Sequence, residues 1–485
     1  MSKRNCRCTG EHSRELQFVS GPGFSRRQFF RVAGTGLTGY YFARVARPID
    51  VLAQSKVETA NTAKNCIFVF LAGAPSHVDM FDYKEDADVM RPVDVGASMG
   101  PETFNGIRMP RRLLPGLSDQ LGDLLIVRSV LAKALVHQLA QTWAQIGRNP
   151  TGALGNISPN IGAVVALEKE ATRKPTDVMP GFVAINAGNI PGAGYLSSRY
   201  APFQVQPSPA GLAGLTHPDG KTRFDSRWKL IQDLDSKLRI DSPYGKSVED
   251  MGEFYDSALQ LMGSPEVNAA FQYTTDEQTR YGGASSSFGG ACIVARNVLK
   301  MNNGTRFITI NSNGWDMHSN IYTGNGSLFT LAPQIDTGLT QLIKDLKATA
   351  SPETPGKTLF DETLIVLQGE FGRTPVYNGQ GGRDHFLRQF SVFAGGGAAG
   401  AKVLGATDKT GNAAVDFGWH ANRDIRNEDI FASIYSALGI DYTTVRYDDP
   451  LGRGFEYVPF AKDGVYEPVT EIFKTKSSSR TRRVI

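Results

Sequence analysis

The sequence predicts an α/β protein whose doubly wound, mostly parallel sheet is flanked by helices. Two observations predict this fold. Short continuous apolar runs recur along the chain, as they do in strands buried on both faces of a sheet. Segments with helical periodicity lie between them, and strands that alternate with helices form parallel sheets. Hydrophobic residues make up 41% and charged residues 21% of the 485 residues, which excludes a disordered, collagen-like or disulfide-scaffold protein.

Six apolar runs are the predicted strands. The first opens at Cys66 and ends just before Gly73. Runs of this length without polar alternation suit central strands that helices cover on both faces. They lie at residues 66–71, 124–127, 182–185, 307–310, 363–367 and 390–393.

Helical patterns are expected at residues 246–262, 289–301, 328–350 and 427–438. In 328–350 the apolar residues recur at steps of three and four, which places them on one stripe of a helix. Residues 188–222 are rich in Gly, Pro and Ser and predict a long surface excursion. We expect one α/β domain over 54–473, followed by a flexible basic tail at 474–485.

The excess of positive charge lies in the first 53 residues. They hold nine Lys/Arg and three Asp/Glu, which leaves 43 basic and 45 acidic residues in 54–485. The body of the chain therefore gives no argument for a nucleic-acid partner. Its two cysteines, Cys66 and Cys292, are too few to staple a chain of this length and are interpreted as small buried hydrophobic residues.

Residues 1–53 resemble a twin-arginine (Tat) signal peptide and leader. Arg26 and Arg27 precede a weakly apolar stretch, 32–43, which is shorter than the roughly 20 residues that span a membrane. A site suited to signal peptidase ends at Ala53. We expect export through the Tat translocase, cleavage after Ala53, and a periplasmic or otherwise extracytoplasmic mature protein with no transmembrane segment. A basic surface helix is the alternative, and replacing both arginines by Lys distinguishes the two.

Polar clusters follow the ends of three predicted strands, where ligands bind in open α/β sheets. The clusters are residues 75–82, 311–318 and 369–375, with 382–385 shortly after the last. His77, His318 and His385 lie in them beside carboxylates, whereas His217 and His420 lack such company and are interpreted as loop residues. Imidazoles with carboxylates suit Zn, Mn or Fe, and carboxylate-rich sites also accept Mg or Ca. The constellation therefore predicts a divalent metal site.

Individual members of this constellation also have simpler interpretations. Asp316 and His318 point to one side only if the segment stays extended, and an isolated Asp-x-His is typical of a surface turn. Arg373 and Arg383 are expected to clamp an anionic oxygen of a substrate bidentately. An Arg near a Glu such as Glu370 is, however, usually a structural ion pair.

The same motifs resemble those of the bacterial family called domain of unknown function 1501. The resemblance rests on residues 75–82, 315–318, 370–375, 382–385, 395–397, 405–408 and 429–440, and on the twin-arginine leader. The family is placed in the alkaline-phosphatase-like superfamily, with phosphatases, sulfatases and cofactor-independent phosphoglycerate mutases. The resemblance spans nearly the whole chain and implies an alkaline-phosphatase-like α/β core with a two-metal site at the strand ends. The family has no settled activity, so no substrate follows from it.

The resemblance also implies a set of metal ligands for Zn, Mn, Mg or Ca. The Asp that directly follows the first strand in the superfamily is missing here, so His77 or Asp79 must substitute. Glu370 stands where an Asp is usual. The complete implied set is His77, Asp79, Asp316, His318, Glu370, Asp384 and His385.

The position of the expected nucleophile is unusual. Residues 140–147 resemble the helix that follows the nucleophilic Ser, Thr or Cys in phosphatases, and the nucleophile position then falls on His137. An imidazole there could ligate a metal, act as a general base for water, or become a phosphohistidine, and a purely structural histidine is the alternative. We expect His137 close to Asp316 and Glu370, with any hydrolysis proceeding by water.

Two functions from different classes fit these observations. The first is an exported metal-dependent hydrolase that acts on phosphate or sulfate esters, including small anionic esters or polysaccharides. The second is a catalytically degenerate binding or assembly protein that retains the alkaline-phosphatase-like fold, which the missing Ser, Thr or Cys favours. A third interpretation is a polysaccharide-binding surface protein that uses Tyr195, Tyr200 and Phe203, although aromatic residues in such a segment are more often packing anchors.

Overall fold

The computed structural model describes residues 57–214, 218–239, 245–262 and 264–474. Residues 58–485 group into one compact unit, and the fold below is that of its described part. The twin-arginine leader with its cleavage site, the tail beyond Lys474 and His217 lie outside the described residues. The expectations for those segments therefore stay predictions.

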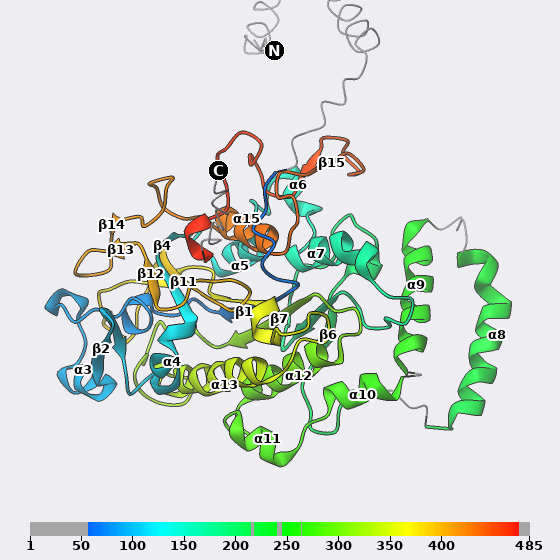
Figure 1. Ribbon diagram of the computed structural model, residues 1–485, viewed down its shortest axis with the longest axis horizontal. Coiled ribbons are helices and arrows are strands. Elements are labelled where there is room, and N and C mark those ends of the chain that lie inside the picture. The colour runs from blue at the N-terminus through cyan, green and yellow to red at the C-terminus, as the bar shows by residue number, and fades with distance from the viewer. Residues whose placement is uncertain (1–56, 215–217, 240–244, 263, 475–485) are drawn as a thin grey trace, which may run out of the picture. The chain divides into compact units, whose positions relative to one another are not determined.

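An eight-stranded sheet forms the centre of the fold (Figure 1). Its order is β12-β4-β11-β8-β1-β7-β5-β6. Every pairing is parallel except those of β11, which runs antiparallel to both of its neighbours. The strands are β1 (Asn65–Ala72), β4 (Leu124–Leu131), β5 (Phe182–Ile185), β6 (Phe203–Val205), β7 (Phe307–Asn313), β8 (Thr363–Gln368), β11 (Arg388–Ala394) and β12 (Lys402–Leu404). The mostly parallel sheet and its six predicted strands are confirmed.

Helices pack on both faces of this sheet, as a doubly wound fold requires. The four predicted helices are confirmed as α9 (Lys246–Met262), α12 (Ser287–Met301), α13 (Leu328–Ala348) and α15 (Asn427–Ala437). The others are α3 (Val93–Met99), α4 (Pro115–Asp119), α5 (His137–Ile146), α6 (Ala153–Asn156), α7 (Ile161–Lys169), α8 (Lys221–Arg239), α10 (Pro265–Phe271), α11 (Thr275–Arg280) and α14 (Leu359–Glu362). No helix in the described segments is both long and apolar enough to cross a membrane.

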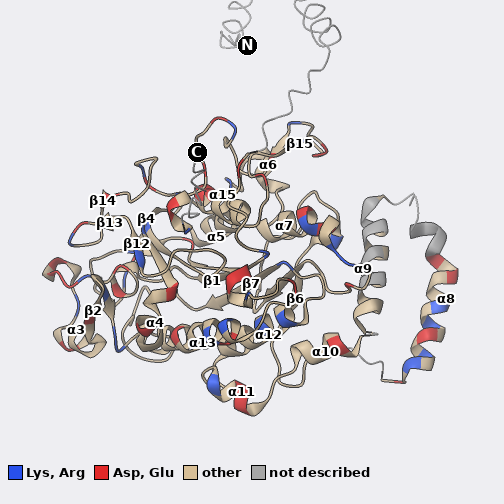
Figure 2. Ribbon diagram, viewed as in Figure 1, with Lys and Arg blue, Asp and Glu red and all other residues tan. Residues whose placement is uncertain are grey.

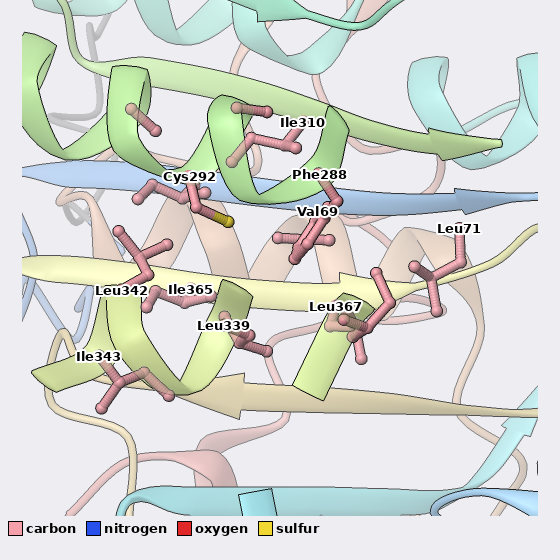
Figure 3. Packing of buried hydrophobic residues seen from close by; sticks show 14 of the residues in the cluster. Val69, Leu71, Phe288, Cys292, Ile310, Leu339, Leu342, Ile343, Ile365 and Leu367 are labelled. Atoms are coloured by element: carbon pink, nitrogen blue, oxygen red, sulfur yellow. The ribbon is translucent and has the colours of Figure 1, made fainter. Parts of the chain in front are cut away.

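The alternation of side chains along β1 explains the two layers of core. Ile67, Val69 and Leu71 point to one face, where they join the cluster that contains the apolar stripes of α12 and α13. Figure 3 shows Val69 and Leu71 on this face. It also shows their partners on neighbouring strands and helices: Phe288, Cys292, Ile310, Leu339, Leu342, Ile343, Ile365 and Leu367. The intervening β1 residues join the opposite cluster with α7 and α15. Both faces of β1 are therefore buried, which is why its sequence is continuously apolar.

Several smaller features complete or modify the prediction. The expected excursion at 188–222 is not only a loop, because Phe203–Val205 adds the edge strand β6 to the sheet. Cys66 and Cys292 are buried free thiols, as expected, and burial raises the pKa of each. Four two-stranded hairpins lie outside the main sheet: β2 (Pro101–Phe104) with β3 (Ile107–Pro110), β9 (Gly372–Arg373) with β10 (His385–Phe386), β13 (Ala406–Thr407) with β14 (Ala414–Asp416), and β15 (Val445–Arg446) with β16 (Phe455–Glu456).

The candidate site residues lie at one edge of the sheet. The parallel strands β1, β7, β8 and β4 end there and release the segments that carry Gly73, Asp316, Glu370 and His137. Strand β11 runs the opposite way, so it begins at this edge, three residues after His385. Five strands thus deliver side chains to the same place.

Candidate metal centre

Three imidazoles and one carboxylate converge at this edge of the sheet. His137, Asp316, His318 and His385 each offer one ligand atom, and these four atoms lie within 4.8 Å of one another. The Asp316 Oδ1 atom is 3.1 Å from His137 Nε2, 3.2 Å from His318 Nε2 and 3.9 Å from His385 Nε2. The His318 and His385 Nε2 atoms are 2.8 Å apart. The segments that supply these residues are more than 60 positions apart along the chain, apart from the neighbouring pair Asp316 and His318.

The other ring nitrogen of each histidine has its own partner. His137 Nδ1 lies 2.7 Å from Glu370 Oε1, and His318 Nδ1 lies 2.9 Å from Asp384 Oδ1. His385 Nδ1 lies 2.6 Å from the carbonyl oxygen of Leu135. All three partners accept hydrogen bonds, so in the neutral rings the proton is on Nδ1 and the lone pair is on Nε2. Metal-binding histidines are oriented by acceptors in this way.

The donor set fits a divalent cation. Arg373 donates to Asp316 Oδ1 at 2.6 Å and lies 3.5 Å from His137 Nε2, but the remaining Nε2 lone pairs that face one another repel unless further positive charge lies between them. A shared proton would relieve one such contact, whereas a divalent cation relieves all of them. At zinc–nitrogen distances of roughly 2.0–2.1 Å, the ligand atoms of a tetrahedral site are about 3.3 Å apart, and the distances here scatter around that value. Imidazole and carboxylate together suit Zn, Mn or Fe better than Ca.

Burial and neighbouring charges tune the ligands of the metal-free protein. Burial disfavours the charged form of His137, but the hydrogen bond and charge of Glu370 outweigh it and raise the pKa of His137. Burial lowers the pKa of His385. Although partial burial alone would raise the pKa of Asp316, its ion pair with Arg373 lowers it. Asp316 is therefore ionised at neutral pH and ready to ligate a cation.

Glu370 and Asp384 orient histidines instead of joining the group of ligand atoms. The Glu370 carboxylate is fully buried and accepts hydrogen bonds from the Gly73 backbone at 2.9 Å and from Gln141 Nε2 at 3.0 Å, in addition to contacting His137. Asp384 is exposed at the rim, where it contacts His318, and the hydrogen bond from that ring lowers the pKa of Asp384. Both were expected as direct ligands. In the structure each carboxylate instead contacts the Nδ1 atom of a ligand histidine, on the far side of the ring from the converging Nε2 atoms.

Arg373 is at the centre but does not face a substrate. Its guanidinium is completely buried and donates to the carbonyl oxygens of Gly73, Ala74 and Arg383 and, at 2.6 Å, to Asp316 Oδ1. These contacts engage Nε and both terminal nitrogens. The expected anion clamp is thus corrected: as placed, Arg373 holds the ligand Asp316 and balances its charge.

His77, Asp79 and Arg383 lie outside the group. The Asp79 and Arg383 side chains are both fully buried and pair at 2.8 Å, and Tyr322 bonds to both. Arg383 cannot contact a substrate in this position, and Asp79 is neutralised without a metal. His77 is also fully buried, with Nε2 2.9 Å from the Gly411 carbonyl oxygen. His420 pairs with Glu467 and Glu471 in an exposed loop, in line with its interpretation as a loop residue.

The sequence pattern did not reveal two positioning residues, Asn378 and Gln141. The side-chain amide of Asn378 donates to the His318 carbonyl oxygen at 2.9 Å and to Asp384 Oδ1 at 3.2 Å, and its Oδ1 accepts from the Gly382 backbone N–H at 2.9 Å. It therefore joins the two loops that carry the ligands. Gly382 itself approaches so closely that a Cβ there would lie 2.1 Å from the His318 carbonyl carbon. Gln141 was detectable in principle, because it lies four residues after His137 and so on the same face of α5.

Replacing Glu370 by Gln is expected to weaken metal binding about 10- to 100-fold, because the loss of an outer-shell carboxylate has that effect on metal sites. The variant keeps the shape of the side chain but removes the charge that fixes the His137 tautomer. The matched control is Glu362→Gln. Glu362 is also buried but lies before β8, at the opposite end of the strand, where it pairs with Lys64. Competition with a fluorescent chelator measures both affinities, and equal losses in the two variants would contradict the assignment.

Comparisons with known proteins place this geometry in context. A search of curated proteins finds no match for the chain. Among solved structures the chain is similar to phosphonate monoester hydrolase SpPMH from Silicibacter pomeroyi (10% identity, 86% of this chain and 78% of that chain, TM-score 0.37). It is also similar to lipoteichoic acid synthase LtaP from Listeria monocytogenes (12% identity, 82% and 76%, TM-score 0.36). A third is a protein in the alkaline phosphatase superfamily from Vibrio parahaemolyticus (11% identity, 78% and 67%, TM-score 0.32).

A family model covers most of the chain. It matches residues 63–465, from the start of the first strand of the sheet to beyond α15, and so includes every residue of the metal centre. Its description is "Protein of unknown function (DUF1501)". The chain belongs to this family.

Proposed function

We propose that this protein is a metal-dependent hydrolase of phosphate or sulfate esters in which water, not a protein side chain, attacks the ester. One observation carries the proposal. Three histidines whose Nδ1 atoms face acceptors bring their Nε2 atoms and Asp316 Oδ1 within 4.8 Å of one another. His137, Asp316, His318 and His385 would hold a divalent cation there, and such a cation would supply Lewis acidity, which can lower the pKa of a bound water to about 7.

The exposure of the group supports a reactive site over a purely structural one. The side chains of Asp316 and His318 are 50% and 41% exposed, whereas Arg373 and Glu370 behind them are fully buried. A small ester can therefore reach the solvent side of the group. The buried residues keep the ligands oriented, because Arg373 fixes Asp316 and Glu370 fixes the His137 ring.

The local sequence at the start of α5 supports attack by water. This helix begins at His137 and its N-cap is Val136. A covalent mechanism would use a hydroxyl or thiol at this position. His137 is instead hydrogen-bonded to Glu370 through Nδ1, and its Nε2 lies 3.1 Å from Asp316 Oδ1. It is thus positioned to bind a cation and not to carry a phosphoryl group.

A direct experiment tests the proposal on the purified full chain. Elemental analysis is expected to find a stoichiometric transition metal. p-Nitrophenyl phosphate or p-nitrophenyl sulfate is expected to be hydrolysed, the activity to be lost with EDTA, and the activity to return with Zn or Mn. EDTA should also lower the melting temperature, because a ligand of the folded state stabilises it. A protein without bound metal, which takes up none on dialysis, would overturn the proposal.

The same sample has an expected pH dependence. Histidine ligates as the neutral ring, so protons compete with the cation. Because Glu370 raises the pKa of His137 and burial lowers the pKa of His385, His137 gains its proton before His385 as the pH falls. Metal content and activity should therefore be complete at alkaline pH and fall as the pH drops, with the loss beginning above the ordinary histidine pKa of about 6.5.

The alternative is a binding or assembly protein that keeps the metal only for structure. It is favoured by the number of protein ligands, because structural zinc sites have four, whereas catalytic zinc sites have three and an open position. Stoichiometric metal without turnover of any ester in the panel would establish this alternative. For either function we propose Tat-dependent export to an extracytoplasmic location, on the basis of Arg26, Arg27 and the cleavage-like site at Ala53.

A further inference from the structure

Two loops border the metal centre, and both expose aliphatic side chains. In the loop before α5, the Leu135 carbonyl oxygen lies 2.6 Å from His385 Nδ1. In the loop after β9, the Thr374 hydroxyl accepts a hydrogen bond from the Asp384 backbone N–H at 3.0 Å. The exposed aliphatic side chains of the two loops are Leu135, Val136 and Val376. An apolar border suits an uncharged organic group, because a charged group loses hydration against such a surface.

The two arginines that the sequence suggested for substrate binding are buried and already paired within the protein. The Arg373 guanidinium donates to backbone carbonyl oxygens and to Asp316. Arg383 pairs with Asp79, outside the group of ligand atoms. Among the described residues, Arg373 is the only Lys or Arg that forms an ion pair with Asp316 or Asp384. As placed, neither arginine can meet the charge of a substrate.

The formal charges around the group leave no excess of positive charge. The carboxylates of Asp316, Glu370 and Asp384 contribute three negative charges, and Arg373 contributes one positive charge. A divalent cation with neutral histidine ligands would bring the total to zero. The rest of the body adds no positive field, because residues 54–485 hold 43 basic and 45 acidic side chains. Figure 2 shows both signs interspersed along helices such as α8 and α11.

We propose that this site prefers esters with a single negative charge and apolar organic groups, namely phosphate diesters or sulfate monoesters, over phosphate monoesters. The inference rests on the proposed hydrolysis of such esters. A phosphate monoester carries nearly two negative charges above its second pKa of about 6, and the second charge would meet Asp316 and Asp384, which are 50% and 58% exposed. A diester or a sulfate monoester avoids this repulsion, and its organic groups can lie against the aliphatic border.

The first test is a binding measurement that needs no turnover. Benzenesulfonate and phenylphosphonate have similar shapes and no ester bond, and at pH 8 they differ by about one negative charge. Isothermal titration into the Zn-loaded full chain is expected to show about 10-fold tighter binding of benzenesulfonate, because the extra charge of phenylphosphonate is repelled by nearby carboxylates. Tighter binding of phenylphosphonate would overturn the proposal.

A positive charge placed on the border should reverse the preference. Val136→Lys is expected to improve the affinity for phenylphosphonate relative to benzenesulfonate about 10-fold. Val376→Lys tests the other loop and serves as a second variant if the first fails to fold. The control is Val93→Lys, which adds the same charge at a side chain that is 90% exposed on α3 and should keep the wild-type ratio. Wild-type ratios in both border variants would also contradict the proposal.

Turnover then separates this inference from the proposed function. The values of kcat/KM for bis-p-nitrophenyl phosphate, p-nitrophenyl sulfate and p-nitrophenyl phosphate are each compared with the uncatalysed rate. The greatest acceleration for the diester or for the sulfate supports the inference and identifies which of the two esters the site prefers. The greatest acceleration for p-nitrophenyl phosphate overturns the inference and leaves the hydrolase function intact. If none of the three is hydrolysed by metal-loaded protein, the proposed function fails, and the affinity ratio still tests the charge preference.

Discussion

Simultaneous replacement of His318 and His385 by alanine is expected to abolish stoichiometric metal binding. These two side chains supply two of the four converging ligand atoms, and their Nε2 atoms form the closest pair in the group. Loss of an outer-shell partner already weakens metal sites about 10- to 100-fold, so loss of two direct ligands should exceed 100-fold. Isothermal titration with Zn or Mn into chelator-treated protein measures the change.

The matched control for this experiment is His420→Ala. His420 is 44% exposed, close to the 41% of His318, and it also pairs with carboxylates, Glu467 and Glu471. It lies outside the group of converging atoms. Its loss should leave metal affinity unchanged. If the double variant retains wild-type affinity while both proteins remain folded, the ion is bound elsewhere and the proposed function loses its basis.

The stability of the metal-free double variant adds an independent measurement. In the wild type without metal, the Nε2 atoms of three imidazoles and one carboxylate oxygen of Asp316 face one another at short range. Removing two rings relieves the repulsion between the facing Nε2 atoms but also removes the hydrogen bonds of His318 to Asp384 and of His385 to the Leu135 carbonyl oxygen, so only a small change in the melting temperature of the apoprotein is expected. Addition of metal should raise the melting temperature of wild type but not of the variant, because only binding to the folded state stabilises it.

The fold was largely predictable because buried strands and helices have characteristic patterns of apolar residues in the sequence. Strands covered on both faces are continuously apolar, as in β1 and β8, and helices that cover them carry a stripe with the period of α13. Whether a buried strand runs parallel or antiparallel to its neighbours does not show in this pattern. Residues 390–393 indicate a buried strand but not that β11 runs antiparallel, and this orientation is what brings His385 to the same edge as Asp316.

The location of the candidate site was predictable, but which of its residues would contact the cation and which would orient the ligands was not. Both ligand histidines and orienting carboxylates follow strand ends, so the sequence cannot tell which group contacts the cation. Glu370 is fully buried behind His137, an order that depends on where α5 begins. Arg383 and Asp384 are a second example. Adjacent residues of an extended segment point to opposite sides, but the sequence does not say which of the two faces the interior. Arg383 therefore turns inward to Asp79, and Asp384 turns outward to the rim.

The buried ion pair between Asp79 and Arg383 is the basis of the second large predicted effect, a loss of folding stability. Asp79 is fully buried and lies between two arginines, Arg383 and Arg91, whose side chains are 0% and 7% exposed. Ser76 and Tyr322 also donate to the carboxylate. Asp79→Asn keeps the shape of the side chain and leaves two buried guanidinium groups without a counter-charge. Breaking a buried pair in this way is expected to lower the free energy of unfolding by about 3–5 kcal/mol.

Chemical denaturation at neutral pH measures this loss, and Glu85→Gln is the control. Glu85 pairs with Arg108 nearby but is 46% exposed, so its removal should cost less than about 1 kcal/mol. The double variant Asp79→Asn with Arg383→Met should recover part of the stability, because it removes one of the two uncompensated charges. Equal effects of Asp79→Asn and Glu85→Gln would show that the buried pair is not a principal source of stability.

The stabilisation by the Asp79 carboxylate is also expected to depend on pH. Burial alone would raise the pKa of Asp79, but Arg383 and Arg91 outweigh it and hold the pKa well below its usual range. Stabilisation by this carboxylate is therefore complete above the ordinary value of about 3.9 and is lost as the pH falls toward the folded-state value. Asp79→Asn should lack this component of acid destabilisation. Because Asp79 does not touch the converging ligand atoms, the folded variant should bind metal with wild-type affinity, whereas a direct ligand at this position would lose both stability and metal together.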